Sequence, residues 1–312
     1  MAPPPRLMLL DSASMYFRAF HGVPDTVTSP DGLPIGAVRG FLDAVARMLS
    51  DHPATELVAC FDADWRPDWR VALLPSYKAH RVDERATDDS IESIEEVPDA
   101  LLPQVPIIED VLDAIGISRV GVDGFEADDV IGTLAVSSKL PVDIVTGDRD
   151  LFQLVDDEAA VNVLYIGKGF AKAERVNDTW IKAKYGITAA SYADFATLRG
   201  DPSDGLPGVR GVGDKSAAAV VDEFSTIEVL LEALRDPDVL VPFRAKIESA
   251  EEYLVRAIEV VRVRQDVPIP PLSPALPKSV ADPEKVIYLA ERWGLARSID
   301  RVVTAMGITH PN

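Results

Sequence analysis

A set of acidic residues recurs where predicted strands end or a predicted helix begins. The apolar segments 7–10, 57–61 and 143–146 are each followed within two residues by an aspartate, and three acids open the helical pattern at 126–129. The set consists of Asp11, Asp62, Glu126, Asp128, Asp129, Asp148, Asp150, Asp201 and Asp204. Carboxylates without nearby Cys or His suit hard cations such as Mg²⁺ and Mn²⁺. If they converge, two ions about 3.5–4 Å apart could catalyse a phosphoryl displacement.

The segment 126–129 has two explanations at this point. Acidic residues in a first helical turn interact favourably with the helix dipole, which requires no ligand. Carboxylates that converge and are buried without a cation, however, cost several kcal/mol each. Two roles therefore remain open for Glu126, Asp128 and Asp129: stabilisation of the helix N-terminus and metal binding.

The predicted elements would bring many of these acids to one edge of a sheet. Short apolar runs that alternate with helical patterns predict an α/β fold, with a central, mostly parallel sheet and helices on both faces. The expected strands are 7–10, 57–61, 143–146 and 161–166, and the expected helices are 35–49, 104–115 and 126–138. Functional residues of such sheets lie at the carboxyl ends of strands, which is where Asp11, Asp62 and Asp148 are expected.

Strand patterns fade after about residue 175. We therefore expect an α/β core at 1–175 and a helical region at 176–312, whose clearest helices are 245–263 and 283–294. The Pro-rich segment 267–278 predicts an irregular connection on the surface.

Composition limits the classes of function. The chain has 312 residues, one cysteine (Cys60) and a formal net charge of −20. No apolar run reaches the ~18 residues that span a membrane, and the single cysteine fits a cytoplasmic protein. A protein that binds DNA through its overall field should be basic, so net charge alone disfavours a nucleic-acid partner.

Six motifs in one order resemble the 5′-nuclease family, which includes bacterial 5′–3′ exonucleases, flap endonucleases and the nuclease domain of bacterial DNA polymerase I. The motifs are Asp11 with Tyr16-Phe17-Arg18-Ala19-Phe20, Phe61-Asp62, Ser76-Tyr77-Lys78-Ala79-His80-Arg81, Glu126-Ala127-Asp128-Asp129, Thr146-Gly147-Asp148-Arg149-Asp150 and Gly200-Asp201-Pro202-Ser203-Asp204. The resemblance implies a free-standing member with a PIN-like 5′-nuclease fold and a helical arch at about 65–100.

The resemblance also implies a metal-dependent 5′–3′ exonuclease and flap endonuclease that uses two or more Mg²⁺ or Mn²⁺ ions. The first metal site would contain Asp11, Asp62, Glu126 and Asp128. The second, or a third nearby, would contain Asp129, Asp148, Asp150, Asp201 and Asp204. The catalytic residues that the resemblance implies are Arg18 and Lys78, near the scissile phosphate, and Arg70, Tyr77 and Arg81, in the arch over the single-stranded 5′ end. Tyr77 could stack on an unpaired base there.

A Gly-rich segment at about 200–217 resembles the family's helix-hairpin-helix-type turn. Its glycines allow close approach to a phosphate, and the following helix points its N-terminus at that phosphate. The implied contacts to duplex DNA are Gly208, Gly211, Gly213, Lys215 and Ser216. They would not depend on base sequence, and the hairpin carbonyls would hold K⁺, as is usual in the family. The implied partner is DNA with a 5′ flap or 5′ end, and not a membrane.

The chain departs from the family pattern in places, and two other functions compete with the nuclease prediction. Gly205 stands where the family commonly has Asn, and the arch is followed by an acidic stretch, 83–99, that the resemblance does not explain. The segment 61–64 also resembles the start of a haloacid-dehalogenase-type phosphatase, with Asp62 as covalent nucleophile. A DNA-binding module without catalysis is the other alternative, which the complete acid set disfavours.

Overall fold

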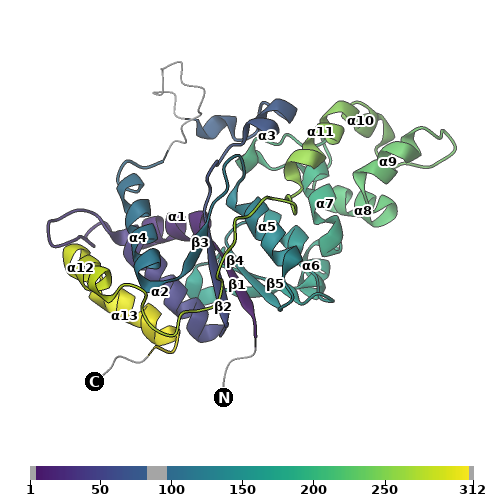
Figure 1. Ribbon diagram of the computed structural model, residues 1–312. Helices are drawn as coiled ribbons and strands as arrows, with labels where there is room; N and C mark the ends of the chain where they lie inside the picture. Colours follow the sequence, from purple (N-terminus) through teal and green to yellow (C-terminus); the bar gives the residue numbers. More distant parts are fainter. Residues whose placement is uncertain (1–4, 83–96, 309–312) are drawn as a thin grey trace.

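A six-stranded sheet forms the centre of the computed structural model, which describes residues 5–82 and 97–308 (Figure 1). The strand order is β3-β2-β1-β4-β5-β6, and neighbouring strands are parallel except for β5 and β6. The strands are β1 Leu7–Asp11, β2 Glu56–Cys60, β3 Ser118–Val120, β4 Val142–Thr146, β5 Val161–Tyr165 and β6 Glu174–Val176. The predicted α/β class with a mostly parallel sheet is confirmed.

The four predicted strands correspond to β1, β2, β4 and β5, with ends within one residue of the prediction. The sequence did not reveal β3 and β6, because each has three residues and lies at an edge of the sheet. A segment this short has no visible period of two. Because β6 spans residues 174–176, the predicted boundary at residue 175 falls inside a strand.

Alternation along β1 separates two hydrophobic cores. Leu7 and Leu9 belong to one core, whereas Met8 and Leu10 belong to the other. Successive side chains of a strand point to opposite faces of the sheet, so each face needs its own cover of helices.

One face of the sheet is covered by helices from both ends of the chain (Figure 1). These helices are α1 Ser12–Gly22, α2 Gly36–Asp51, α4 Val105–Ile115, α12 Pro283–Trp293 and α13 Ala296–Ala305. The packing of α13 on α2 and of α12 on α4 brings the last helices back to the N-terminal part of the chain. The predicted region 176–312 is therefore not one packing unit.

The other face carries α5 Ala127–Ser137 and the first helices of the C-terminal half. Beyond them, the helical part extends to one side of the sheet (Figure 1). Its helices are α6 Asp178–Tyr185, α7 Tyr192–Arg199, α8 Asp214–Phe224, α9 Ile227–Leu234, α10 Arg244–Glu248 and α11 Glu251–Val261. The predicted helix 245–263 is thus divided into α10 and α11.

The segment between α11 and α12 is irregular, as predicted from its prolines, and it follows the edge of the sheet. Leu57 N–H donates to the carbonyl of Pro274 at 2.8 Å, and Ala281 N–H donates to Ile115 at 3.2 Å. This segment carries the chain from the helical part back to the first layer.

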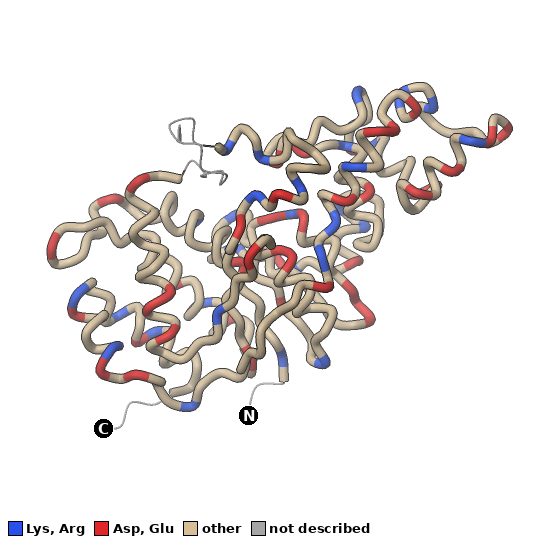
Figure 2. Tube along the Cα trace, turned by 45° about the horizontal axis from the view of Figure 1, so that its top comes forward, with Lys and Arg blue, Asp and Glu red and all other residues tan. Residues whose placement is uncertain are grey.

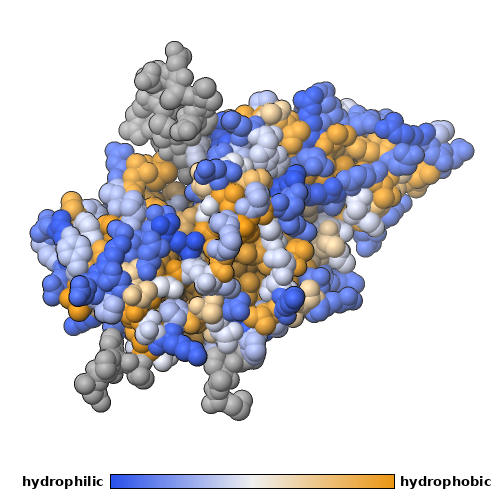
Figure 3. All heavy atoms as spheres, viewed as in Figure 1, coloured by the Kyte–Doolittle hydropathy of each residue, from blue (hydrophilic) through white to orange (hydrophobic). Residues whose placement is uncertain are grey.

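The surface carries charges of both signs over both layers. Figure 2 shows acidic and basic segments interspersed along the chain. On the face seen in Figure 3, hydrophilic residues cover the outer helices, with hydrophobic residues between them. Among the described residues, no helix is long and apolar enough to cross a membrane.

The region predicted as a helical arch is described only in part. It contains α3 Asp68–Leu73 and a short 3₁₀ turn at Ala79–Arg81. Residues 83–96 of the predicted arch, with most of the acidic stretch 83–99, lie outside the described residues.

The strand order determines where a ligand can bind. The chain leaves β1 for β2 on one side, and β4 pairs with β1 on the other side. The carboxyl ends of β1 and β4 therefore flank a topological switch point, the usual place for a binding crevice in an open parallel sheet.

A substitution at Gly132 of α5 tests how closely the irregular segment after α11 packs on this helix. A Cβ at Gly132 would lie 2.5 Å from Val263 Cγ1 and 2.7 Å from the Arg264 carbonyl oxygen. We expect Gly132→Ala to lower the free energy of unfolding by about 1–3 kcal/mol, although Ala favours a helix. Urea denaturation measures the change. Val136→Ala on the exposed side of α5 is the control, with a change within about 0.5 kcal/mol; equal results would contradict this packing.

Candidate active site

An acidic cleft of 310 Å³ opens at the carboxyl ends of β1, β2 and β4. It contains six of the predicted metal ligands and two of the predicted DNA-contacting side chains, Lys78 and Arg81. The six carboxylates lining it are those of Asp11, Asp62, Glu126, Asp128, Asp148 and Asp201. The cations that line it are Lys78, Arg81 and Arg149. Segments from five separate parts of the sequence thus meet at the expected edge of the sheet.

Asp11 is the most buried carboxylate at the end of a strand. It ends β1 and caps α1, accepting a hydrogen bond from Ser14 N–H at 3.0 Å. The hydroxyl of Thr146 donates to it at 2.6 Å and accepts from Asp148 N–H at 2.8 Å, which ties the turn after β4 to β1. Burial raises the pKa of Asp11 to about 7, with added repulsion from Asp62 and Asp148.

Asp62 and Asp128 share this environment. Asp62 accepts a hydrogen bond from Ala127 N–H at 2.7 Å, which joins the end of β2 to the start of α5. Burial raises the pKa of Asp62, and burial together with the charges of Asp11 and Asp148 raises the pKa of Asp128 well above its usual value. A bound cation would relieve this penalty on the ionised carboxylates.

The second group of acids lies beside the first. Burial and the nearby charges of Asp148, Asp204 and Asp201 raise the pKa of Asp150, and burial raises that of Asp204 to about 6. Arg81 contacts Asp204 at 2.9 Å. Asp148 and Asp201 line the cleft, whereas Asp150 and Asp204 stand behind them.

Gly205, the departure from the family pattern, has a structural reason. Its φ is +73°, and a Cβ there would collide with the carbonyl oxygen of Ser76. Lys78 N–H donates to the carbonyl of Asp204 at 3.0 Å. Glycine therefore lets the turn that carries Asp201 and Asp204 lie directly against the backbone that carries Lys78.

Glu126 is the one cleft carboxylate with a lowered pKa among those described above. Burial raises its pKa, but Lys78 and Arg70 outweigh burial. Glu126 also caps α5 in a capping box with Asp129. Both explanations that the sequence left open for Glu126 are therefore compatible with its position.

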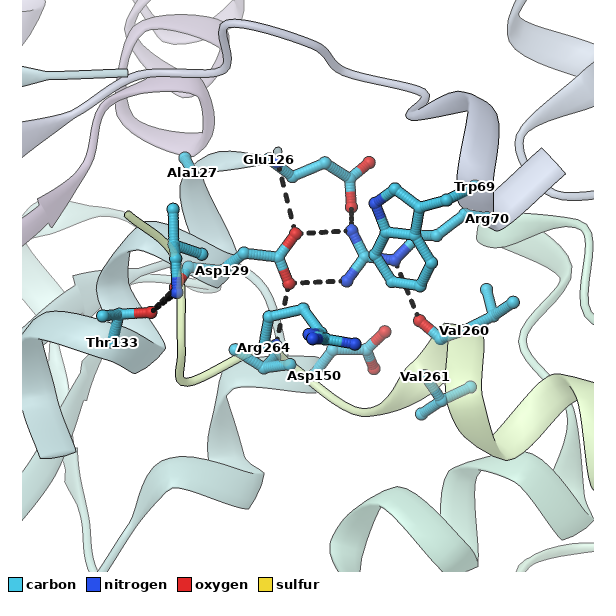
Figure 4. Close-up of polar contacts among 12 residues, drawn as sticks. Trp69, Arg70, Glu126, Ala127, Asp129, Thr133, Asp150, Val260, Val261 and Arg264 are labelled. Carbon is cyan, nitrogen blue, oxygen red and sulfur yellow. Dashed lines mark hydrogen bonds and ion pairs between the residues drawn. The ribbon is translucent and has the colours of Figure 1, made fainter. Parts of the chain in front are cut away.

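Asp129 does not face the cleft. It is fully buried, and Arg70 donates to both of its oxygens at 2.7 Å (Figure 4). The backbone N–H groups of Arg264 and Glu126 donate to it as well, at 2.9 and 3.3 Å. Because its acceptor positions are used, Asp129 fits helix capping and ion pairing, and the implied role as a direct metal ligand does not fit this position.

Arg70 and Tyr77 also differ from what the resemblance implies. Arg70 is 2% exposed and donates to Glu126 at 2.8 Å and to the Val260 carbonyl at 3.1 Å (Figure 4). Tyr77 is buried and donates its hydroxyl to Glu126 at 2.8 Å. Neither side chain lines the cleft, so direct contact with a phosphate or a base does not fit; both support Glu126 from behind.

Lys78 and Arg81 do line the cleft, whereas Arg18 lines a neighbouring pocket that shares Ser14 and Phe17 with it. Arg18 lies beside Gly147, where a Cβ would be 3.1 Å from its Nη2 and 2.7 Å from Ser14 Oγ. Glycine at this position allows α1 to approach the turn after β4. Arg149 also lines the cleft and was not predicted, because nothing in the motif separates it from its acidic neighbours.

The carboxylates fit divalent ions that keep part of their water. In the described ranges, no three His, Cys, Asp or Glu side chains are arranged to hold one ion between them. Mg²⁺ is usually bound by one or two carboxylates together with several waters. The buried, mutually repelling carboxylates of the cleft can supply the one or two protein ligands that such a hydrated ion needs.

The Gly-rich hairpin lies at the start of α8. Gly208 and Gly211 have φ of +66° and +76°, and Gly213 precedes α8, whose first turn contains Lys215 and Ser216. Lys246 of α10 reaches the same place, with its Nζ 3.4 Å from the Gly211 carbonyl oxygen. The sequence did not indicate Lys246, because it lies 30 or more residues beyond the predicted hairpin contacts and only the fold brings it to them.

A groove of 490 Å³ separates this hairpin from α10 and α11. Arg210 and Lys246 line it, and the described residues around it include no carboxylate. In a chain of net charge −20, this is a local cationic surface.

Two family models match the chain along most of its length. Residues 6–186 match the N-terminal resolvase-like domain of 5′–3′ exonucleases, and residues 187–283 match their C-terminal SAM fold. The chain belongs to the 5′–3′ exonuclease family. Five of the cleft acids, Asp11, Asp62, Glu126, Asp128 and Asp148, lie in the first matched part. Asp201 and the hairpin lie in the second.

Relatives and solved structures agree with this assignment. The chain is 54% identical over 303 residues to a 5′–3′ exonuclease of Streptomyces coelicolor, covering 96% of this chain and 99% of the relative. It is 46% identical over 310 residues to a 5′–3′ exonuclease of Mycobacterium tuberculosis, covering 96% and 97%. Its fold is similar to that of the bacteriophage T5 flap endonuclease, solved with DNA and metal ions, with a TM-score of 0.63 and 15% identity over 97% of this chain and 99% of that one.

Family membership decides between the functions weighed from the sequence. The phosphatase alternative for the segment 61–64 is excluded, because the chain as a whole belongs to a nuclease family. The two family models meet at 186/187, whereas the sequence suggested a division at 175.

The Arg70 ion pairs provide a test of this arrangement. We expect Arg70→Met to lower the free energy of unfolding by about 3–5 kcal/mol, because Asp129 and Glu126 would stay buried without their cation. Urea denaturation in EDTA measures the change without metal effects. The control is Arg119→Met, which removes an exposed pair with Asp113 and should cost less than about 1 kcal/mol. Equal losses would mean that the Arg70 pairs are exposed to solvent.

Proposed function

We propose that this chain is a divalent-metal-dependent 5′ nuclease that hydrolyses phosphodiester bonds in DNA. It acts as a 5′–3′ exonuclease and as a structure-specific flap endonuclease in replication and repair. The observation that carries the proposal is the cleft in which six carboxylates from separate segments meet at the switch point of the sheet. The names of the relatives, and the flap endonuclease with a similar fold, support it.

The cleft acids divide into two groups for holding Mg²⁺ or Mn²⁺. One ion would lie among Asp11, Asp62, Asp128 and Glu126, held directly by one or two of them and through water by the others. Asp148 and Asp201 would hold the other, with Asp150 and Asp204 accepting hydrogen bonds from its water. When bound, the ions supply Lewis-acid stabilisation of the phosphate charge and lower the pKa of water.

The cations of the cleft act on the phosphate. Lys78 and Arg81 line the same space as the acids and can donate to phosphate oxygens as charge develops, and Arg18 lies next to this space beside Gly147. Lys78 is the best placed, because it pairs with Glu126 and also experiences the charge of Asp62. Arg70 and Tyr77 serve as positioning residues.

Duplex DNA is held by the hairpin and not by the overall field. The backbone at Gly208, Gly211 and Gly213, with Lys215 and Ser216, faces the phosphates, and Lys246 adds a cation. K⁺ at the hairpin carbonyls, which the resemblance implies, would share this place with the Lys246 ammonium, and no step of the proposed reaction depends on it. A 5′ flap or 5′ end enters the cleft.

The primary test is cleavage of a 5′-labelled flap substrate. We expect cleavage with Mg²⁺ or Mn²⁺ and none with EDTA. Asp128→Asn and Asp148→Asn should each reduce the cleavage rate about a hundredfold or more, while duplex affinity stays close to that of the parent chain. Asp110→Asn, at an exposed ion pair with Lys285, is the control and should cut normally. Normal cleavage by either cleft variant would refute the ligand assignment.

The hairpin is tested by the salt dependence of duplex binding. A lysine that contacts phosphate releases about one counterion, so Lys215→Ala and Lys246→Ala should each reduce the slope of log K against log salt by about 1. Fluorescence anisotropy with a blunt duplex in Ca²⁺ measures this without cleavage. Lys278→Ala, at an exposed position in the irregular segment, should leave the slope unchanged. An unchanged slope in the hairpin variants would place the duplex elsewhere.

A further inference from the structure

The carboxylate of Glu126 is fully occupied by side chains. Its Oε1 lies 2.5 Å from Lys78 Nζ, and its Oε2 accepts from Arg70 at 2.8 Å and from the Tyr77 hydroxyl at 2.8 Å. The side chain of Glu126 is 5% exposed. A metal ion that is to use Glu126 must therefore displace one of these donors.

Arg70 and Tyr77 cannot easily leave. The Arg70 guanidinium is also held by both oxygens of Asp129 and by the Val260 carbonyl, and it lies 4.5 Å from the Trp69 ring. Tyr77 is buried in the hydrophobic core behind the cleft. Moving either side chain would leave buried polar groups without partners.

Lys78 is the donor that faces the cleft. Its side chain is 15% exposed, compared with 2% for Arg70, and it lines the same space as the other carboxylates. Its remaining side-chain hydrogen bond is to the carbonyl of Trp65 at 3.3 Å. The Lys78 ammonium can turn into the cleft while the buried ion pair between Arg70 and Glu126 stays in place.

We propose that a divalent ion and the Lys78 ammonium compete for Glu126, so that loading of the cleft releases Lys78 while Arg70 and Tyr77 keep Glu126 in place. Two cations cannot share one carboxylate oxygen at contact distance without strong repulsion. Lys78 is thereby freed for a phosphate oxygen only when the cleft holds its ion. The inference rests on the proposed function, since it concerns the same metal site.

The exchange predicts an energetic coupling that a binding experiment can measure. Mn²⁺ affinity is determined by electron paramagnetic resonance for the parent chain, Lys78→Met, Glu126→Gln and the double variant, in the absence of DNA. Lys78→Met should tighten Mn²⁺ binding about tenfold, because a charged hydrogen bond no longer competes with the ion. In the Glu126→Gln background, the same substitution should have an effect of about threefold or less, which reflects the loss of a nearby charge alone.

Arg81→Met is the matched control. Arg81 lines the same cleft but pairs with Asp204. Its substitution should change Mn²⁺ affinity equally in both backgrounds. If the effect of Lys78→Met is also equal in both backgrounds, the competition is refuted.

A second measurement uses the parent chain and does not depend on how the variants fold. Acylation of lysine amines, read by mass spectrometry, should accelerate at Lys78 several-fold when Ca²⁺ or Mn²⁺ is added. Lys285, which pairs with Asp110 at 2.8 Å away from the cleft, should react at the same rate with and without the ion. An unchanged or slower rate at Lys78 would overturn the proposal.

The two proposals fail differently. If Mn²⁺ does not bind the parent chain at all, the metal-dependent function itself is wrong. If Mn²⁺ binds and supports cleavage but Lys78 neither couples to Glu126 nor becomes more reactive, only the exchange is wrong.

Discussion

The buried fork between Arg70 and Asp129 holds the active-site end of the molecule together. It joins α3 to α5, and through the Val260 carbonyl it joins both to α11. These elements belong to the parts matched by two different family models. Because the charges are buried, each is stable only while its partners are present. The position of Glu126 in the cleft therefore depends on correct docking of the helical part.

The net charge of −20 has different meanings in different places. In the cleft, burial and mutual repulsion raise the pKa values of Asp11, Asp62 and Asp128, which makes the space favourable for divalent cations. At the hairpin, Arg210 and Lys246 line a groove without a carboxylate among the residues described there. Elsewhere acidic and basic segments alternate (Figure 2). DNA recognition by local contacts is compatible with an acidic protein.

Much of the fold could be predicted because it depends on local patterns. The apolar runs that form β1, β2, β4 and β5 are long enough to be recognised, and those of β1, β2 and β4 are followed by an acid at the edge where the cleft opens. The side chains of Arg70, Tyr77 and Asp129 were assigned to the wrong environment, because motifs specify residue types and not the direction in which a side chain points. The groups that turn them away from the cleft come from distant segments, such as the carbonyl of Val260 and the N–H of Arg264.

The return of α12 and α13 to the first layer affects how the molecule can fold during synthesis. These helices cover α2 and α4, which are made some 170 or more residues earlier. Until α13 leaves the ribosome, part of the hydrophobic face of α2 has no cover, although the sheet and the cleft can already form. Contacts between such distant segments close slowly, because a long loop must first be ordered. The helical layer that begins with α1 is thus among the last parts of the chain to be completed, and exposed hydrophobic surface of this kind favours aggregation until it is covered.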